Sequence, residues 1–247
     1  MIQLLAPAKL TWYLEVTGVR DDGYHLLRSE MLSVGLVDQL VLDDDADYLR
    51  VLGPASVPTD DSNLIRRALH LVGRQAGVTL DKQIPTGGGL GGGSSDAAAI
   101  LRWAGGVSAD VAVRLGGDVP FCQIGGRALV QGIGELVTPL PFEERVVTLL
   151  LANFEVSTAR VYQAYDELVA GGQRPAGANH LEEPARIVEP RLATLLDWAR
   201  AEFGDVQLAG SGSTVFLEGH VFDTPYGDVM SPVGAVKWCQ TIATPAA

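Results

Sequence analysis

The sequence predicts an α/β protein, in which strands and helices alternate along the chain. Strand patterns occur at 9–16 and 146–151, and amphipathic helix patterns occur at 64–72 and 190–203. A glycine-rich segment, 85–96, joins a strand pattern to a run of strong helix formers. The 247 residues, 47% of them hydrophobic, are enough for one large domain or for two smaller domains that share an interface.

The first predicted element is a strand at 9–16, whose residues alternate between two faces. Lys9 and Thr11 point to the same side, and the opposite, apolar face consists of Leu10, Trp12, Leu14 and Val16. Turn-forming residues at 18–23 separate this strand from a second apolar stretch at 24–37. This arrangement predicts a β-hairpin at the start of the chain.

The next elements lead to the glycine-rich segment. The short apolar run 39–42 is predicted as a separate strand. The polar triplet 61–63 is typical of an N-cap, and it precedes the amphipathic helix 64–72. Residues 78–84 are predicted as the strand that delivers the chain to the glycines.

The second half of the chain continues with further strands and helices. The run 146–151 is apolar throughout, which is typical of a strand that is buried on both faces. A helix starts at Ser157, another covers 190–203, and 206–216 has the pattern of a strand, a turn and a strand. Residues 221–226 have the composition of a loop, and no clear closing helix follows them.

The segment from Pro85 to Asp96 places six glycines around one leucine. Without side chains, successive backbone N–H groups can face one anion. The helix formers that follow place a helix N-terminus at the same point, with Ser94 or Ser95 as its N-cap. A glycine loop that leads into a helix N-terminus predicts phosphate binding rather than a flexible linker. Asp96 in the first turn fits this prediction if it points away from the anion or if a cation bridges the two.

Three known types of nucleotide site fit this sequence poorly. A Walker A loop requires Gly-Lys-Ser/Thr, and the segment contains no lysine. Gly87, Gly89 and Gly92 match a dinucleotide-binding pattern only formally, because a run of glycines satisfies almost any spacing. The protein-kinase motifs His-Arg-Asp and Asp-Phe-Gly do not occur in the chain.

Charge and cysteine content bear on further classes of protein. The formal net charge of −12 disfavours non-specific binding to nucleic acid or to anionic membranes. Cys122 and Cys239 form neither a metal-binding spacing nor a disulfide framework, which is typical of a reducing compartment. No apolar run is long enough to span a bilayer, and the N-terminus lacks the basic start of a signal peptide. We therefore expect a cytosolic protein.

Several polar residues have both a structural and a functional interpretation. Taken alone, Lys9 is interpreted as a solvated lysine on the open face of a sheet, and Asp118 as a turn or cap residue. His25 follows a turn and by itself indicates no chemistry. The segment 210–212 is either a hairpin turn or a place where backbone amides approach an anion.

Considered together, seven motifs resemble the GHMP kinase superfamily and occur in the order typical of that family. They are Ala6-Pro7-Ala8-Lys9-Leu10, Asp22-Gly23-Tyr24-His25, the loop from Pro85 to Ser95, Gly117-Asp118-Val119-Pro120-Phe121, Ser157-Thr158-Ala159 with Tyr162, Asn179-His180-Leu181-Glu182, and Gly210-Ser211-Gly212. The resemblance implies a two-domain α/β protein. A ribosomal-S5-like N-terminal domain would cover 1–141, a ferredoxin-like C-terminal domain would cover 142–247, and the active site would lie between them.

The resemblance also implies the activity of a small-molecule kinase. The segments 23–25 and 118–120 narrow it to transfer of the ATP γ-phosphoryl group to the 2-hydroxyl of a cytidine diphosphate-linked methylerythritol, in the non-mevalonate isoprenoid pathway. Mg²⁺ is expected with ATP. Lys9 and Asp118 would be the catalytic pair, with Asp118 either accepting the hydroxyl proton or aiming the hydroxyl.

Further site residues are implied by the same resemblance. The ATP loop would consist of Pro85, Thr86, Gly87, Gly88, Gly89, Leu90, Gly91, Gly92, Gly93, Ser94 and Ser95. The substrate would contact Thr11, Tyr24, His25, Tyr162, Gly210 and Ser211, with the cytosine ring stacked between the two tyrosines. Neither a protein ligand for Mg²⁺ nor an oligomeric state follows from the sequence.

The chain departs from the family pattern at a few positions, and two alternatives stay open. The family usually has asparagine at Thr11 and alanine at Gly117, and the segment 103–110 is shorter than usual. One alternative is another small-molecule kinase of the superfamily, of the mevalonate or homoserine type, against which Tyr24 and His25 argue. The other is a catalytically silent nucleotide-binding protein on the same scaffold.

Overall fold

The fold is a large mixed sheet with helices packed on it, seen in a computed structural model that describes residues 1–53 and 57–246. The strands are β1 (Ile2–Val19), β2 (His25–Asp43), β3 (Tyr48–Leu52), β4 (Gly77–Asp81), β5 (Arg127–Gly132), β6 (Leu136–Pro139), β7 (Val146–Leu151), β8 (Gln207–Leu208), β9 (Val215–Glu218), β10 (Tyr226–Ser231) and β11 (Gly234–Thr244). The helices are α1 (Leu64–Val72), α2 (Gly92–Trp103), α3 (Ala109–Ala112), α4 (Val119–Ile124), α5 (Thr158–Ala170), α6 (Glu182–Val188) and α7 (Pro190–Phe203). The predicted α/β class is confirmed.

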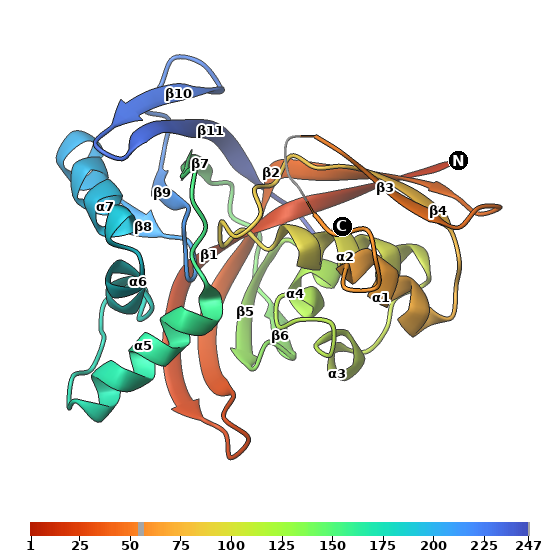
Figure 1. The fold of residues 1–247 in the computed structure, drawn as a ribbon, viewed down its shortest axis with the longest axis horizontal. Coiled ribbons are helices and arrows are strands. Elements are labelled where there is room, and N and C mark those ends of the chain that lie inside the picture. Colours follow the sequence, from red (N-terminus) through yellow and green to blue (C-terminus); the bar gives the residue numbers. More distant parts are fainter. Residues whose placement is uncertain (54–56, 247) are drawn as a thin grey trace.

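Strand β2 is the centre of the sheet, whose main path runs β3-β4-β2-β11-β7-β9-β8. It pairs with β1 along one edge, and with β5, β11 and β4 in succession along the other. The last strand, β11, connects the two halves of the sheet, because it pairs with β7 and then reaches β2 at Ala243 and Thr244. Figure 1 shows the β1–β2 hairpin running between two groups of helices.

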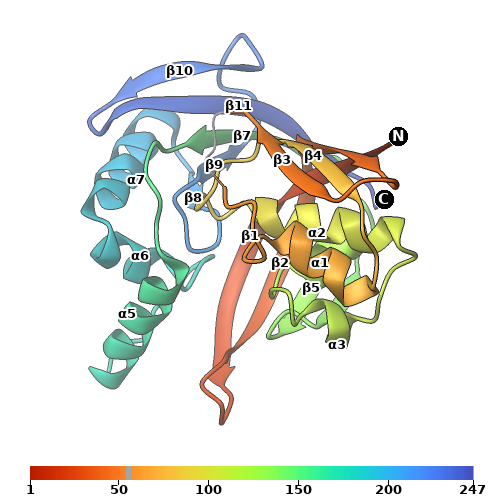
Figure 2. The ribbon, with the colours of Figure 1, turned by 45° about the vertical axis from the view of Figure 1, so that its right-hand side comes forward.

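The helices form two groups on the two halves of the sheet. Helices α1 to α4 lie beside β3, β4 and β5, whereas α6 and α7 lie beside β8 and β9, with α5 below them (Figures 1 and 2). Each group covers its own apolar cluster. A third cluster joins them, and it includes Leu10 from β1, Leu90 from the glycine loop and Phe216 from β9. The division at residue 141 stays a prediction.

The predicted alternation at 9–16 is wrong in its second half, because β1 contains a β-bulge at Trp12. The strand register passes from Thr11, opposite Met31, to Tyr13, opposite Glu30, so that Trp12 has no partner of its own. A bulge shifts the side-chain alternation by one residue. Leu14 therefore lies in the same cavity lining as Lys9 and Thr11 instead of sharing a face with Leu10.

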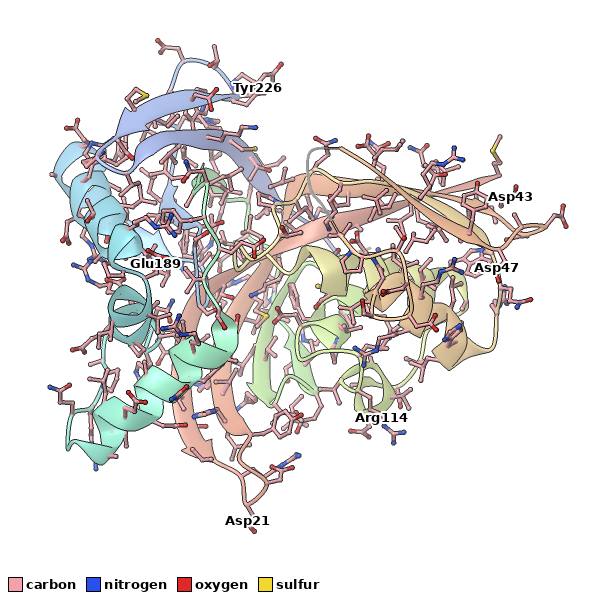
Figure 3. The ribbon with its side chains drawn as sticks, in the orientation of Figure 1. Asp21, Asp43, Asp47, Arg114, Glu189 and Tyr226 are labelled. Carbon is pink, nitrogen blue, oxygen red and sulfur yellow. The ribbon has the colours of Figure 1, made fainter. Side chains whose placement is uncertain are left out.

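Other elements also differ from the sequence-based expectation. The predicted separate strand at 39–42 is the end of the long strand β2, since its residues pair with β1 and β4 without a break. The C-terminal segment, in which the sequence indicated only a loop at 221–226 and no closing helix, forms the hairpin β10–β11. In this hairpin Val236 and Trp238 alternate with exposed residues, and Tyr226 of the outer strand β10 stands in solvent (Figure 3).

Helix boundaries follow their capping residues closely. Asn63 caps α1 by accepting a hydrogen bond from the Ile65 amide, and Gly73 ends the helix in the left-handed conformation. Ser157 caps α5, and α7 has the predicted bounds, with Pro190 at its first position. Among the described residues, no helix is both long enough and apolar enough to cross a membrane.

Candidate active site

The glycine loop connects β4 to α2 and ends at the N-terminus of that helix. The N-cap of α2 is Gly91, in the left-handed conformation with a φ of 65°, and no side chain caps the helix. The prediction of Ser94 or Ser95 as the N-cap is therefore wrong, since both lie inside the first turn. The first N–H groups of a helix have no partner within it, so the uncapped end of α2 offers them to an anion.

Gly89 and Gly92 have no room for a side chain, because other protein atoms occupy the place where a Cβ atom would stand. A Cβ atom at Gly89 would lie 2.2 Å from the carbonyl oxygen of Ala209, and one at Gly92 would lie 2.7 Å from Nζ of Lys82. The Thr214 amide also donates a hydrogen bond of 3.1 Å to the Gly88 carbonyl. The loop is thus held against the turn after β8, with which it shares an interface.

Gly89→Val is expected to reduce the free energy of unfolding by about 3 kcal/mol or more, because Cβ meets a backbone oxygen and Gly89 has a φ of +78°. Nucleotide affinity falls with it, since the loop cannot keep its place against Ala209. Thermal unfolding without nucleotide tests this expectation. Gly93→Ala is the control for stability, because a Cβ there meets only the side chain of Leu64, at 3.5 Å. Equal stability of the two variants would contradict the close approach.

Lys9 and Asp118 are brought together although 109 positions separate them in the chain. Nζ of Lys9 lies 3.3 Å from Oδ2 of Asp118 and donates a hydrogen bond of 3.1 Å to Oγ1 of Thr11. The lysine is buried on β1, so the interpretation as a solvated residue is wrong. Asp118 stands at the N-cap position of α4, yet its carboxylate does not cap the helix and faces the cavity. Gly91 allows this approach, since a Cβ there would lie 2.6 Å from Cγ of Lys9.

A second charged cluster, which the sequence did not indicate, lies behind the loop. Nζ of Lys82 forms ion pairs with Asp38 and with Asp96, the latter at 2.8 Å, and all three side chains are almost completely buried. Oδ1 of Asp38 accepts hydrogen bonds from the amides of Gln83 and Ile84, which begin the loop. Lys82 therefore bridges the two carboxylates, Asp38 and Asp96, and it lines the first cavity together with Asp96. Lys82 directly follows β4, three residues before Pro85, and nothing in the sequence marked it as the partner of Asp38 and Asp96.

One lysine cannot fully compensate the charges of two buried carboxylates. The unfavourable loss of hydration is larger for Asp96. Burial raises the pKa of Asp96 to about 7, with Lys82 opposing the shift and Asp38 adding to it. Its Oδ1 has no hydrogen-bond partner within the described part of the chain, whereas Asp38 has two backbone donors. Asp96 is therefore the carboxyl group of the pair that takes up a proton.

This shift predicts a pH dependence of stability. The pKa of Asp96 in the folded protein lies above that of an unfolded aspartate, about 3.9. The folded state therefore binds more protons than the unfolded state between pH 4 and pH 7. The stabilising contribution of Asp96 to the free energy of unfolding is therefore present below pH 4 and is lost as the pH rises towards 7. Urea unfolding of the wild type and of Asp96→Asn across this pH range measures the contribution. If the free energy of unfolding changed with pH equally in both proteins, Asp96 would not be the titrating group.

Aromatic side chains line a neighbouring cavity of about 700 Å³. The rings of His25 and Tyr162 are stacked with centroids 4.6 Å apart, and Tyr165 meets His25 edge-on. Tyr24 lies at the rim, more than half exposed, with the guanidinium of Arg20 over its ring at 5.5 Å. The ring that contacts Tyr162 in the free protein is thus His25, and Tyr24 stays available at the cavity entrance. Burial, followed by the nearby Asp118 carboxylate, raises the pKa of Tyr162.

The segment 210–212 contributes to the cavity beside the loop. Oγ of Ser211 forms a hydrogen bond of 2.8 Å with Oγ1 of Thr158, at the start of α5. Nδ2 of Asn179 donates to the carbonyls of Leu208 and Gly210, at 2.9 and 2.7 Å. Asn179 and Thr158, which the sequence associated only with motifs, therefore position the turn that carries Ser211.

Two cavities meet at Asp118. The first, of about 450 Å³, is lined by the glycine loop with Lys9, Thr11, Gly210 and Ser211, and the second is the aromatic cavity. Asp118 and Tyr162 line both. Of the predicted loop residues, two face away from the first cavity. Leu90 is buried in the central apolar cluster, and Ser95 donates its hydroxyl to the carbonyl of Pro7 at 2.6 Å.

Comparisons with known proteins identify the family of this chain. The model of the GHMP kinases N-terminal domain matches residues 63–126, and that of the GHMP kinases C-terminal domain matches residues 158–220. A 4-diphosphocytidyl-2-C-methyl-D-erythritol kinase of Nitrosomonas eutropha is 35% identical, over 86% of this chain and 86% of that protein. The kinase of the same name from Dinoroseobacter shibae is 37% identical, over 89% of this chain and 85% of its own length.

Solved structures give the same result. A crystal structure of 4-(cytidine 5'-diphospho)-2C-methyl-D-erythritol kinase is 31% identical with a TM-score of 0.73, and the match covers 98% of this chain and all of that chain. L. major mevalonate kinase is 13% identical with a TM-score of 0.64, covering 100% of this chain and 97% of that one, and shares the fold alone.

The two-domain fold and the matched relatives identify a small-molecule kinase that uses ATP, in which the glycine loop and the Lys9–Asp118 pair lie at one cavity. The chain belongs to the 4-diphosphocytidyl-2-C-methyl-D-erythritol kinases, within the GHMP kinases.

Proposed function

We propose that this protein transfers the γ-phosphoryl group of ATP to the 2-hydroxyl of 4-diphosphocytidyl-2-C-methyl-D-erythritol, a step of the non-mevalonate route to isoprenoid precursors. The observation that carries the proposal is the meeting of two cavities at Asp118. Polar backbone and a helix N-terminus line one cavity and suit a triphosphate, whereas aromatic rings line the other and suit a nucleobase. A hydroxyl that is anchored by its base in one cavity can thus meet a phosphate in the other.

The Lys9–Asp118 pair stands where the phosphoryl group would move between the cavities. Phosphoryl transfer has a loose transition state, so positioning and charge neutralisation dominate catalysis. Asp118 would accept the hydrogen bond of the acceptor hydroxyl, aim the hydroxyl oxygen at the γ-phosphorus, and take up the proton as the new bond forms. The Lys9 ammonium would balance charge on the transferred group. Thr11 holds the ammonium in place by accepting its hydrogen bond.

Mg²⁺ binding is also part of the proposal. Within the described ranges, no group of three or more His, Cys, Asp or Glu side chains could hold a metal ion by itself. Mg²⁺ needs only one or two protein oxygens when nucleotide phosphates supply the others. The Ser94 hydroxyl and the Asp118 carboxylate, which both line the junction of the two cavities, fit that requirement. Mg²⁺ bound there would neutralise charge on the β- and γ-phosphates.

Coupled ATP turnover with a panel of acceptors tests the proposal. We expect the cytidine diphosphate-linked methylerythritol to be phosphorylated, and mevalonate and homoserine to be left unchanged. Preference for mevalonate or homoserine would identify another kinase of the superfamily. ATP binding without turnover of any acceptor would identify a silent nucleotide-binding protein. The cytosolic location stays a prediction.

A further inference from the structure

The start of the glycine loop rests on a glutamate from the other half of the chain. Oγ1 of Thr86 donates a hydrogen bond of 2.9 Å to Oε1 of Glu155, which lies between β7 and α5. A Cβ atom at Gly87 would lie 2.6 Å from Cγ and 2.8 Å from Cδ of Glu155. The stem of the glutamate therefore occupies the space that a side chain at Gly87 would fill, and its carboxylate holds the residue before it.

The backbone that carries Glu155 is fixed on both sides. Phe154 and Val156 are buried in the apolar cluster that the second group of helices covers. Oγ of Ser213 donates a hydrogen bond of 2.5 Å to the carbonyl of Phe154, and Ser157 caps α5 two residues after Glu155. Glu155 itself is exposed. Its buried neighbours nevertheless present its carboxylate to the loop at a defined place.

Glu155 acts on the loop rather than on the space in front of it. Thr86 and Gly87 line the first cavity, whereas Glu155 and Thr86 line a different cavity of about 530 Å³. A glycine-rich segment has many accessible conformations, so contacts from outside decide which one it adopts. The later part of the loop has such contacts with Ala209 and Thr214. Glu155 supplies the corresponding contact at the start of the loop.

We propose that Glu155 is a positioning residue for ATP binding, which holds Thr86 and Gly87 in the conformation that receives the triphosphate. The proposal rests on the function proposed above, because it takes the glycine loop as the ATP site. The carboxylate has two opposing effects on ATP affinity. Its charge repels a triphosphate, whereas its hydrogen bond orders the loop before the nucleotide binds and so lowers the entropic cost of binding. Because Glu155 is exposed, solvent and salt screen the repulsion, and the ordering effect is the larger.

Calorimetric ATP titration of variants at position 155 tests the balance of these effects. We expect the dissociation constant for ATP to rise about 5- to 10-fold in Glu155→Ala, since one hydrogen bond and the stem are lost. Glu155→Gln keeps an oxygen acceptor for Thr86 and is expected to stay within about 2-fold of the wild type. Glu144→Ala removes an exposed glutamate that lines neither cavity and is the matched control. Unchanged or tighter ATP binding in Glu155→Ala would overturn the proposal.

A double-mutant cycle with Thr86→Val separates positioning from a general loss of structure. Because the two side chains act through one hydrogen bond, the double variant is expected to bind ATP about as weakly as Glu155→Ala alone. In steady-state turnover the KM for ATP rises, and kcat stays within about 2-fold of the wild type, because Lys9 and Asp118 are unchanged. Additive losses in the cycle, or a kcat that falls as far as KM rises, would show a merely structural role.

The titration needs no acceptor substrate, so it separates the two proposals. A wild-type protein that did not bind ATP would contradict the proposed function. Wild-type binding together with unchanged affinity in Glu155→Ala would contradict the positioning role alone.

Discussion

Asp118→Asn is expected to lower kcat by about 10²–10⁴-fold, the range that a positioned acid–base group contributes. The amide cannot take up the proton of the acceptor hydroxyl, and it removes the carboxylate that lies 3.3 Å from Lys9. ATP affinity in the absence of Mg²⁺ is expected to stay near the wild-type value, since the proposed anion site consists of backbone in the glycine loop and α2. Steady-state turnover and calorimetric ATP titration measure the two quantities separately.

Lys9→Ala is the companion variant, with a comparable loss in kcat because the transferred group loses its cation. Asp110→Asn in α3 makes the same chemical change at an exposed position and serves as the control. If Asp118→Asn weakened the binding of Mg²⁺-free ATP as much as it slowed turnover, the carboxylate would have a structural role and the proposed mechanism would fail.

Lys82→Met is expected to reduce the free energy of unfolding by about 3–5 kcal/mol, the usual cost of removing one partner from a buried ion pair. Lys82 and its partners Asp38 and Asp96 are buried, so solvent cannot replace the lost ammonium. Asp38 also holds the amides of Gln83 and Ile84, and disturbance of this carboxylate would loosen the start of the glycine loop. Urea unfolding at pH 7.5 measures the change.

A control variant and a double variant help to interpret the stability of Lys82→Met. Lys237→Met removes an exposed lysine and is expected to change stability by less than about 0.5 kcal/mol. The double variant Lys82→Met/Asp96→Asn is expected to recover part of the loss, because it removes one of the two uncompensated carboxylates. A loss below about 1 kcal/mol in Lys82→Met alone would mean that water reaches the cluster.

Much of the local structure could be predicted because its causes are adjacent in the chain. Asn63 and Gly73 bound α1, and Pro190 begins α7, through interactions within one turn. The hairpin β1–β2 follows from its turn residues. The N-cap of α2 was misassigned because serine is the usual capping residue, whereas an uncapped end leaves its N–H groups free for an anion.

The candidate site was predictable only where a family motif carried it. Lys9, Asp118 and the glycine loop belong to such motifs, and the structure brings them to one cavity. The roles of these residues, and the division at residue 141, stay predictions. The bulge at Trp12 and the pairing of β11 with β2 could not be derived, because both depend on which strand lies alongside.

The sequence by itself determined the α/β class, the capped helices, the glycine loop and the family, since each depends on neighbouring residues or on motifs in a fixed order. Only the tertiary structure decided that Lys82 pairs with Asp96 behind the loop, and that Asp166 meets His25 across 141 positions. Charged groups act over a few ångströms of space rather than along the chain, so their partners become known only when the sheet and helices have packed.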